Sequence, residues 1–228
     1  MKTTVKTILI LSTLIGTLSA QPFHQYKVKS GKIVYEHKKF IVKNNIKITN
    51  GTEEFVREVI PYTAMRTTYY WDNYGDIAYE EAWRVSTGLN ETLPEPKKEY
   101  EMLWKDNARY YYKVSKNKVS RDDWYERKLC EPMASKLDDR GCFGVLYPQM
   151  TDGGEALIAG NATHTYVNGI NADLFLWKGL KLKELNYSTN NSGTERYDLN
   201  NETVAVKIDT NSTIDPTLFS PAWLEGKH

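Results

Sequence analysis

The chain has 228 residues, enough for one large domain or two small ones, and no Pro/Gly/Ser-rich linker divides it. Its 30 basic and 29 acidic residues nearly cancel. They form no basic stripe that would neutralise phosphates, so the composition excludes the common kinds of nucleic-acid binder.

Residues 1–20 have the features of a secretory signal peptide. Lys2 and Lys6 make the start basic, residues 8–18 contain no charge, and Ser19 and Ala20 supply the small residues that precede a cleavage site. We therefore expect export to the periplasm, or alternatively to the cell surface or the extracellular medium.

The mature chain is then expected to begin at Gln21, with residues 21–228 forming a single β-rich domain. The apolar part of the leader is too short to cross about 30 Å of hydrocarbon as a stable helix. No later segment approaches about 18 uninterrupted apolar residues. The prediction is therefore no transmembrane span once the leader is removed.

Apolar and polar residues alternate from residue 26 onward, which is the pattern of half-buried β-strands. The apolar positions shift by one residue after Ser30 and Gly31, and a glycine at such a shift predicts a β-bulge. Further along, Asn44 and Asn45 separate two short alternating runs. This pattern predicts a strand, a turn at the asparagines and a second strand.

Two aromatic hairpins are predicted next. In the first, residues 65–71 and 77–85 alternate on either side of a turn, where Gly75 is available for a positive φ. In the second, residues 100–104 and 110–114 flank a turn at residues 105–107. Their aromatic and β-branched side chains suit a pleated, half-buried surface.

Residues 121–148 break the alternation, and residues 122–129 have the composition of a short helix with an aspartate as N-cap. Strand patterns return within residues 156–166, 174–185 and 203–208. Many short strands separated by turn residues predict a mainly β (α+β) fold, a sandwich or barrel built from a curved antiparallel sheet.

Cys130 and Cys142 are the only cysteines. In an oxidising compartment such a pair is most simply one disulfide, which would close a short polar loop and stabilise the fold by about 3 kcal/mol. A metal or redox pair is the alternative interpretation. The spacing does not favour it, because it is neither Cys-x-x-Cys nor close to paired histidines.

No set of residues with a recognisable catalytic spacing is present. His24, His37 and His164 lack metal-ligand spacing, and the common nucleophile, phosphate-loop and zinc-protease motifs are missing. Glu80 and Glu81 are neighbours on a predicted strand, so they point to opposite faces. We expect a non-enzymatic protein without a metal or cofactor, while a hydrolase built from distant carboxylates stays open as an alternative.

Large aromatic and sulfur-containing side chains are the best candidates for a binding function. Each taken alone is better interpreted as core, but together they would line a concave apolar surface. The candidates are Met65, Tyr69, Trp71, Trp83, Met102, Trp104, Tyr112 and Trp177. Such a surface would hold an acyl chain at about 0.8 kcal/mol per buried methylene, and it needs no short sequence motif.

Several segments together resemble a family of uncharacterised exported bacterial proteins. They are residues 26–36, 71–75, 154–160, 175–183 and 214–219, the last of which precedes Pro221. That family is similar to the LolA/LolB lipoprotein-carrier superfamily, which implies an unclosed antiparallel half-barrel with one or two short helices across its concave apolar side. Relatives often carry a cysteine after the segment ending at Gly160, which this chain lacks, so the resemblance does not guarantee the Cys130–Cys142 bridge.

The leading hypothesis is therefore a periplasmic binding protein that holds an acyl chain, from a lipid or a lipoprotein, in a LolA-like half-barrel. The second hypothesis is a cell-envelope or surface module that binds a protein partner without a lipid. A secreted hydrolase using acidic residues is the third. A lipocalin is less consistent with the chain, because Gly31-Lys32-Ile33 stands where a Gly-x-Trp is usual.

Overall fold

The computed structural model describes residues 24–49, 52–169, 172–189, 196–210 and 212–225. The predicted signal peptide and its cleavage site lie outside these residues. Within the described ranges, no helix has the length and apolar character needed to cross a bilayer.

Strands make up most of the structure. They are β1 (Gly31–Thr49), β2 (Thr52–Asp72), β3 (Ile77–Ser86), β4 (Thr92–Lys105), β5 (Ala108–Lys113), β6 (Lys118–Asp123), β7 (Thr151–Ile158), β8 (Asn161–Asn168), β9 (Ala172–Trp177), β10 (Leu180–Thr189) and β11 (Arg196–Asp209). The α-helices are α1 (Tyr125–Cys130), α2 (Cys142–Leu146) and α3 (Ala222–Glu225). The 3-10 segments are η1 (Asn73–Gly75), η2 (Val114–Lys116), η3 (Glu131–Lys136) and η4 (Pro216–Phe219).

All eleven strands belong to one sheet in the order β6-β5-β4-β3-β2-β1-β11-β10-β9-β8-β7. The described neighbours pair antiparallel, from β1 with β2 and β11 out to β5 with β6 and β7 with β8. The two edge strands, β6 and β7, remain at opposite ends, so the sheet is unclosed. The predicted curved, unclosed antiparallel sheet is confirmed, and three short α-helices accompany it among the described residues, where one or two were expected.

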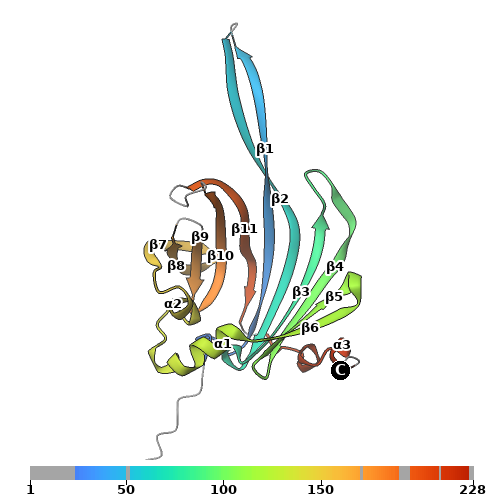
Figure 1. Ribbon diagram of the computed structural model, residues 1–228, viewed down its shortest axis with the longest axis vertical. Helices are drawn as coiled ribbons and strands as arrows, with labels where there is room; N and C mark the ends of the chain where they lie inside the picture. The colour runs from blue at the N-terminus through green and yellow to red at the C-terminus, as the bar shows by residue number, and fades with distance from the viewer. Residues whose placement is uncertain (1–23, 50–51, 170–171, 190–195, 211, 226–228) are drawn as a thin grey trace, which may run out of the picture.

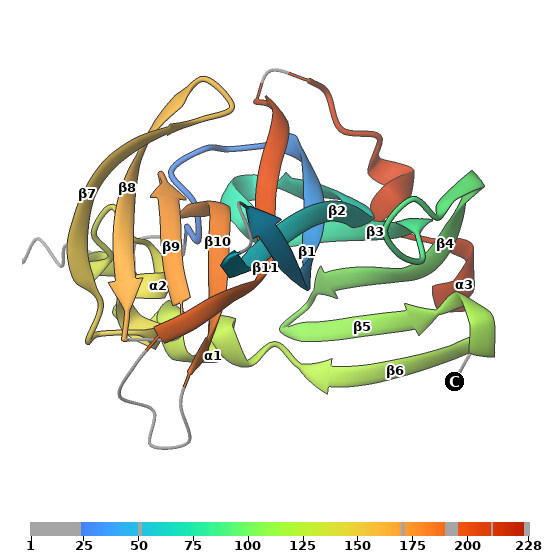
Figure 2. The same cartoon turned by 90° about the horizontal axis from the view of Figure 1, so that it is seen from above.

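The sheet bends into an open trough. Strands β3–β6 form one wall, β7–β10 form the other, and β1, β2 and β11 lie between them (Figures 1 and 2). Helices α1 and α2 lie across the open side of the trough at its lower end (Figure 1). The far halves of β1 and β2 project from the body as a two-stranded arm (Figure 1).

The two aromatic hairpins form as predicted. The first turns through η1, where Asn73, Tyr74 and Gly75 all have positive φ and the Asp72 side chain accepts a hydrogen bond from the Asn73 amide. The second turns at Asp106 and Asn107, both also at positive φ. Asparagine, aspartate and glycine tolerate this backbone region best, which explains why the turn residues were recognisable in sequence.

The turn predicted at Asn44 and Asn45 is wrong. Asn44 and Asn45 lie inside β1, opposite Arg57 and Val56 of β2, and the two strands stay paired as far as Thr49 and Thr52. The long ladder overrides the local turn preference of the asparagines, whose exposed side chains cost nothing on a solvated ribbon. The bulge predicted at Gly31 is also wrong, since β1 begins at Gly31 and its register shifts fall after Val34 and His37.

The predicted helix near residue 122 starts later than expected. Asp122 and Asp123 are the end of β6, and α1 follows Trp124, whose side chain makes no capping bond. Pairing of β6 with β5 places these aspartates opposite Arg109 and Ala108. Strand pairing thus uses residues that an isolated chain would place in a helix cap.

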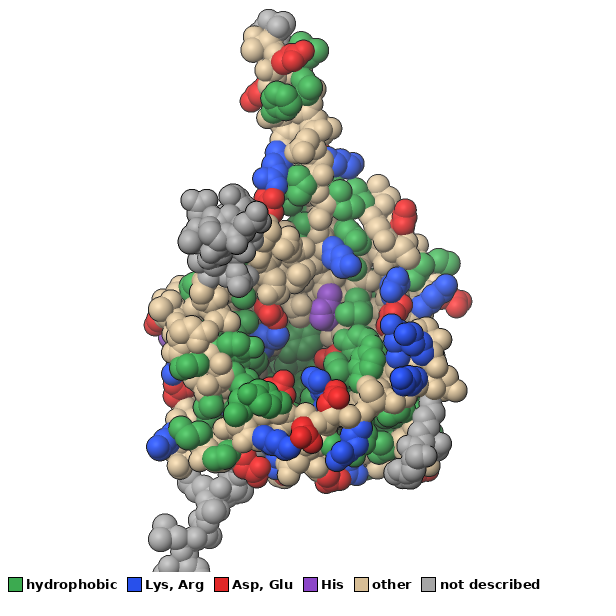
Figure 3. Space-filling view, in the orientation of Figure 1, with side chains coloured by type: hydrophobic (Ala, Val, Ile, Leu, Met, Phe, Trp, Pro, Cys, Tyr) green, Lys and Arg blue, Asp and Glu red, His purple; other side chains and the backbone are tan. Residues whose placement is uncertain are grey.

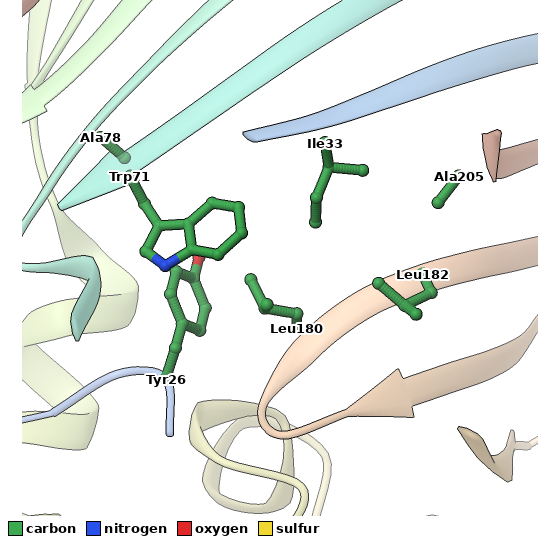
Figure 4. Packing of buried hydrophobic residues seen from close by; sticks show 7 residues of the cluster. All are labelled: Tyr26, Ile33, Trp71, Ala78, Leu180, Leu182 and Ala205. Carbon is green, nitrogen blue, oxygen red and sulfur yellow. The ribbon is translucent and has the colours of Figure 1, made fainter. Parts of the chain in front are cut away.

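The base of the trough is filled by a cluster around Trp71 (Figure 4). Trp71 is fully buried, Tyr26 meets it nearly edge-on at a centroid distance of 6.0 Å, and its indole Nε1 donates to the Val28 carbonyl at 3.0 Å. The other buried members are Ile33, Ala78, Leu180, Leu182 and Ala205, and they come from β1, β3, β10 and β11. One tryptophan therefore joins both walls of the trough.

The convex face of the sheet has its own cover. Phe219, Leu218 and Trp223 from the C-terminal segment pack with Tyr79 and Leu103. The Trp223 indole also donates to the buried Glu101 carboxylate. Both faces are therefore partly covered, which accounts for the aromatic residues at both alternate positions of β2–β5.

Substitution of Gly31 by alanine is expected to destabilise the protein. A Cβ at this position would lie 2.5 Å from Cη2 of Trp71 and 2.7 Å from the Asp209 carbonyl oxygen. Overpacking of this kind costs about 1–3 kcal/mol, which urea denaturation would measure. The matched control is Gly88→Ala, where the new Cβ meets only the flexible Glu91 side chain, and unfolding free energies equal for both variants would contradict this packing.

Candidate functional site

Cross-strand register decides which side chains face the inside of the trough. Tyr69 of β2 is opposite both Ile33 of β1 and Glu80 of β3, and Glu80 is in turn opposite Met102 of β4. Directly opposed residues in an antiparallel sheet share a face. This concave face therefore combines aromatic, aliphatic and carboxylate groups.

A hollow with a volume of about 490 Å³ lies between the concave face and the helical segment. Figure 3 shows it from its open side, with apolar, acidic and basic side chains around it. Its lining residues come from the N-terminal segment, both walls, α1 and α2. The apolar and aromatic ones are Tyr26, Tyr35, Tyr69, Met102, Trp104, Trp124, Phe143, Leu146, Tyr147 and Leu180.

The hollow continues along the strands toward the arm. A second depression of about 380 Å³ shares His37 and Thr203 with the hollow and also includes Met65 and Arg84. A third one, of about 450 Å³, lies on the convex side between Tyr70 and the C-terminal segment and is separate from both. The concave hollow and its extension are the better ligand site, because rings and aliphatic groups from several strands converge there.

The helical cover is tied together by Cys130 and Cys142, which are paired as a disulfide with Cα atoms 5.5 Å apart. This bridge joins the end of α1 to the start of α2, and both sulfurs are buried. Arg127 of α1 donates to Asp76 at 2.5 Å, which attaches the cover to the turn after β2. The Gly179 amide between β9 and β10 donates to the Asp139 carbonyl at 3.2 Å, so the cover is held to both walls and is cross-linked within itself.

Part of the polar lining of the hollow is satisfied by the protein itself. The His37 ring lies between two threonine hydroxyls, with Nδ1 3.0 Å from Thr203 Oγ1 and Nε2 3.0 Å from Thr67 Oγ1. Burial lowers the pKa of His37 to about 4, and the nearby Lys181 ammonium acts in the same direction. The ring is therefore neutral near neutral pH.

Glu80 is the most unusual group in the site. It lies deep in the protein but still borders the hollow, and its Oε1 accepts a hydrogen bond of 2.9 Å from the Tyr100 hydroxyl. Burial raises its pKa to about 7, although the Tyr100 hydrogen bond and Lys181 oppose the shift. A carboxyl that changes charge near neutral pH thus faces the hollow.

The predicted lining residues are distributed over several environments. Tyr69, Met102 and Trp104 border the hollow. Met65 borders its extension. Trp71 is fully buried in the basal core, and Trp177 packs against that core from the end of β9.

Trp83 and Tyr112 belong to the opposite face. Trp83 is opposite Arg66 and has the Lys98 ammonium over its ring at 4.8 Å. Tyr112 is opposite Glu101 and stacks on Trp223 of the C-terminal segment at a centroid distance of 5.4 Å. Alternation within a strand was visible in the sequence, but the register that aligns one strand's faces with the next was not.

Glu80, His37 and the cover residues Trp124, Phe143 and Tyr147 were not predicted as site residues. The sequence pattern predicts only that Glu80 and Glu81 point to opposite faces of a strand. The single signal for Glu80 was its position on the strand face that includes Ala78 and Ala82, two small buried residues. Among the described residues, no group of three or more His, Cys, Asp or Glu side chains is placed to hold a metal ion.

Comparison with known proteins identifies no family. No protein-family model matches the chain, and no curated protein matches its sequence. Among solved structures, an uncharacterised conserved protein from Thermus thermophilus is 8% identical with a TM-score of 0.39, over 81% of this chain and 82% of that one. MucB in complex with MucA(peri) is 13% identical with a TM-score of 0.39, over 87% of this chain. This chain covers 55% of MucB. Likeness at this level does not identify a function.

Replacement of Glu80 by glutamine is expected to change how stability depends on pH. In the folded protein the Glu80 carboxyl keeps its proton up to about pH 7. In the unfolded chain the same carboxyl loses its proton near pH 4.5. The stability that the raised pKa contributes is fully present below pH 4.5 and is lost as pH rises through 7. Glu80→Gln, which resembles the protonated form, should therefore gain melting temperature relative to the wild type across this range.

Thermal denaturation at a series of pH values measures this difference. Glu95→Gln is the matched control, because Glu95 is exposed near the far end of β4. Parallel pH profiles for the wild type and Glu80→Gln would show that the Glu80 carboxyl ionises as freely in the folded protein as in the unfolded chain.

Proposed function

We propose that this protein is a non-enzymatic binding protein that holds an apolar or amphiphilic chain in the concave hollow. The observation that carries the proposal is the hollow itself, which opens to solvent and is lined by side chains from both walls and from the helical cover. Its volume of about 490 Å³ lies within the range of roughly 300–1,000 Å³ that is usual for small-molecule sites. An acyl chain from a lipid or lipoprotein is one ligand of this kind.

The chemistry of the lining supports binding over catalysis. The His37 ring is engaged by two hydroxyls, and its lowered pKa leaves little capacity for taking up a proton near neutral pH. Met102 and Leu146 offer apolar contact instead, and each buried methylene of a ligand would contribute about 0.8 kcal/mol.

The proposal includes export of residues 21–228 as one domain. The leader-like residues 1–20 and the Cys130–Cys142 bridge support it, since disulfides persist in oxidising compartments such as the periplasm. The single sheet, in which β1 and β11 connect the two walls, supports one domain.

A second candidate function is the binding of an envelope or surface protein through the β1–β2 arm. Large apolar side chains on one face of the arm are exposed, and they are Val42, Ile46, Ile48, Phe55 and Val59. The other face carries Lys43 opposite Glu58 and Lys47 opposite Glu54. A two-stranded ribbon alone is only marginally stable in water, which favours a partner for the arm.

Introducing a charge into the hollow is expected to weaken ligand binding. Met102→Asp places a carboxylate among apolar groups, and the affinity for a fluorescent acyl probe should fall by at least about tenfold because the charge disfavours burial of the chain. Fluorescence titration gives the dissociation constant, and mass spectrometry of solvent extracts identifies any lipid that copurifies. The control is Met133→Asp, an exposed methionine in η3. Wild-type protein without bound lipid and without affinity for the probe would refute the binding of an acyl chain in the hollow.

The same probe separates the two candidate functions. Phe55→Asp changes the tip of the arm, where the ring is 81% exposed, and should leave probe binding unchanged. If the arm binds a protein, this variant loses a partner that the wild type retains in a pull-down from an envelope extract. Loss of probe affinity in Phe55→Asp would mean that the arm, not the hollow, contacts the chain.

A further inference from the structure

We propose that the hollow selects ligands with a cationic, ammonium-type end, and that this end lies against Glu80 between the surrounding aromatic rings. The inference rests on the proposed binding function and specifies that the bound ligand carries a positive charge at one end. It follows from the arrangement of rings, carboxylates and apolar groups around one cavity.

Aromatic side chains surround the part of the hollow next to Glu80. Tyr69 is the cross-strand neighbour of Glu80, and its ring meets Trp104 at a centroid distance of 5.7 Å with an interplanar angle of 71°. Tyr26 and Tyr35 border the same cavity from the N-terminal segment and β1, and Trp124 borders it from the residue that precedes α1. Rings set at a steep angle to each other provide two walls of the kind that binds ammonium groups through cation–π attraction.

The charges that face the hollow are predominantly negative. Glu80, Glu126 and Glu184 border it, against a single ammonium, that of Lys181. Lys181 forms an ion pair with Glu184. Neither Glu80 nor Glu126 has an ion-pair partner among the described residues, and His37 is neutral at physiological pH. A cationic ligand would therefore supply the charge that the cavity lacks.

Glu80 is placed to make the specific contact. It lies on β3 between Tyr69 of β2 and Met102 of β4, and Tyr100 donates a hydrogen bond to one of its carboxylate oxygens. The deep position disfavours the ionised form when no cation is present. A cation bound beside Glu80 reverses this preference, because it offsets the cost of burying the negative charge.

The cover and the neighbouring strands provide the apolar contact. Phe143 and Leu146 come from α2, Leu180 comes from β10, and Met102 lies next to Glu80 on β4. An alkyl chain extending from the ammonium group would lie among these side chains. An anionic head group in the same place would meet Glu80 and Glu184, both of which repel it.

The test uses three probes with the same decyl chain, namely decyltrimethylammonium, decanoate and decanol, each below its aggregation concentration. Isothermal titration calorimetry at about pH 8, above the pKa of Glu80, measures each dissociation constant. Decyltrimethylammonium should bind at least about tenfold more tightly than decanoate, given typical energies of cation–π and charge contacts. The Glu80→Gln variant should lose at least about fivefold in affinity for the ammonium probe, a larger loss than it shows for decanol.

Proton linkage provides a second readout that depends on the same carboxylate. Lowering the pH from about 8 to about 6 protonates Glu80, so the wild-type affinity for decyltrimethylammonium should fall, while that of Glu80→Gln should stay nearly constant. Glu95→Gln, on the exposed part of β4, should behave as the wild type at both pH values.

The outcomes separate the two proposals. Equal binding of the three decyl probes, or tighter binding of decanoate, overturns the cationic preference and leaves the binding function in place. Preference for the ammonium probe that persists in Glu80→Gln overturns the assignment to Glu80. If none of the probes binds, the binding function itself fails and the inference fails with it.

Discussion

The burial of Trp71 at the base of the trough is the constraint on which the rest of the structure depends. Its ring covers Gly31, contacts Tyr26 and donates to the Val28 carbonyl, so the N-terminal segment, β1 and β2 are fixed around one side chain. Removal of a buried aromatic of this size typically costs about 3–5 kcal/mol. Because this cluster fills the base, the two walls are held apart without closure of the sheet.

The same strands that bury Trp71 leave the hollow open further along. On the shared face of β2, Trp71 is followed toward the arm by Tyr69, Thr67 and Met65, which border the hollow or its extension. Hydroxyls there form hydrogen bonds with the His37 ring and with the Glu80 carboxylate, and open space remains between these groups and the cover. The disulfide-linked helices bridge this space instead of filling it, which is why the site combines a stable base with room for a ligand.

The fold class and the two aromatic hairpins could be predicted from the sequence, because period-two alternation and turn residues are local signals. The turn predicted at Asn44 and Asn45 is wrong, because a long ladder between β1 and β2 overrides turn preference. The sequence also did not show that Trp83 and Tyr112 lie on the opposite face from the other predicted lining residues. The face that a strand presents relative to its neighbours is set by register, which depends on turn geometry and cannot be read from either strand alone.

Function was harder to predict from sequence for a related reason. Glu80 became a site residue only when the register brought it beside Tyr69 and Met102, with Lys181 approaching from β10. No spacing along the chain joins these residues. When a binding cavity is built from separate strands, the only local signal in the sequence is the alternation of apolar and polar residues. Core strands and strands that line a ligand site show this alternation equally well.

The most direct test of the hollow as a ligand site is a crystal structure of the protein with an alkyl ammonium probe that carries a terminal bromine. Anomalous scattering from the bromine marks the end of the alkyl chain even where the lighter atoms of the probe are weakly defined. We expect one peak beneath α1 and α2, among Met102, Phe143 and Leu146. A peak on the exposed face of the β1–β2 arm, or a trough whose side chains fill the space completely, would contradict a ligand site in the hollow.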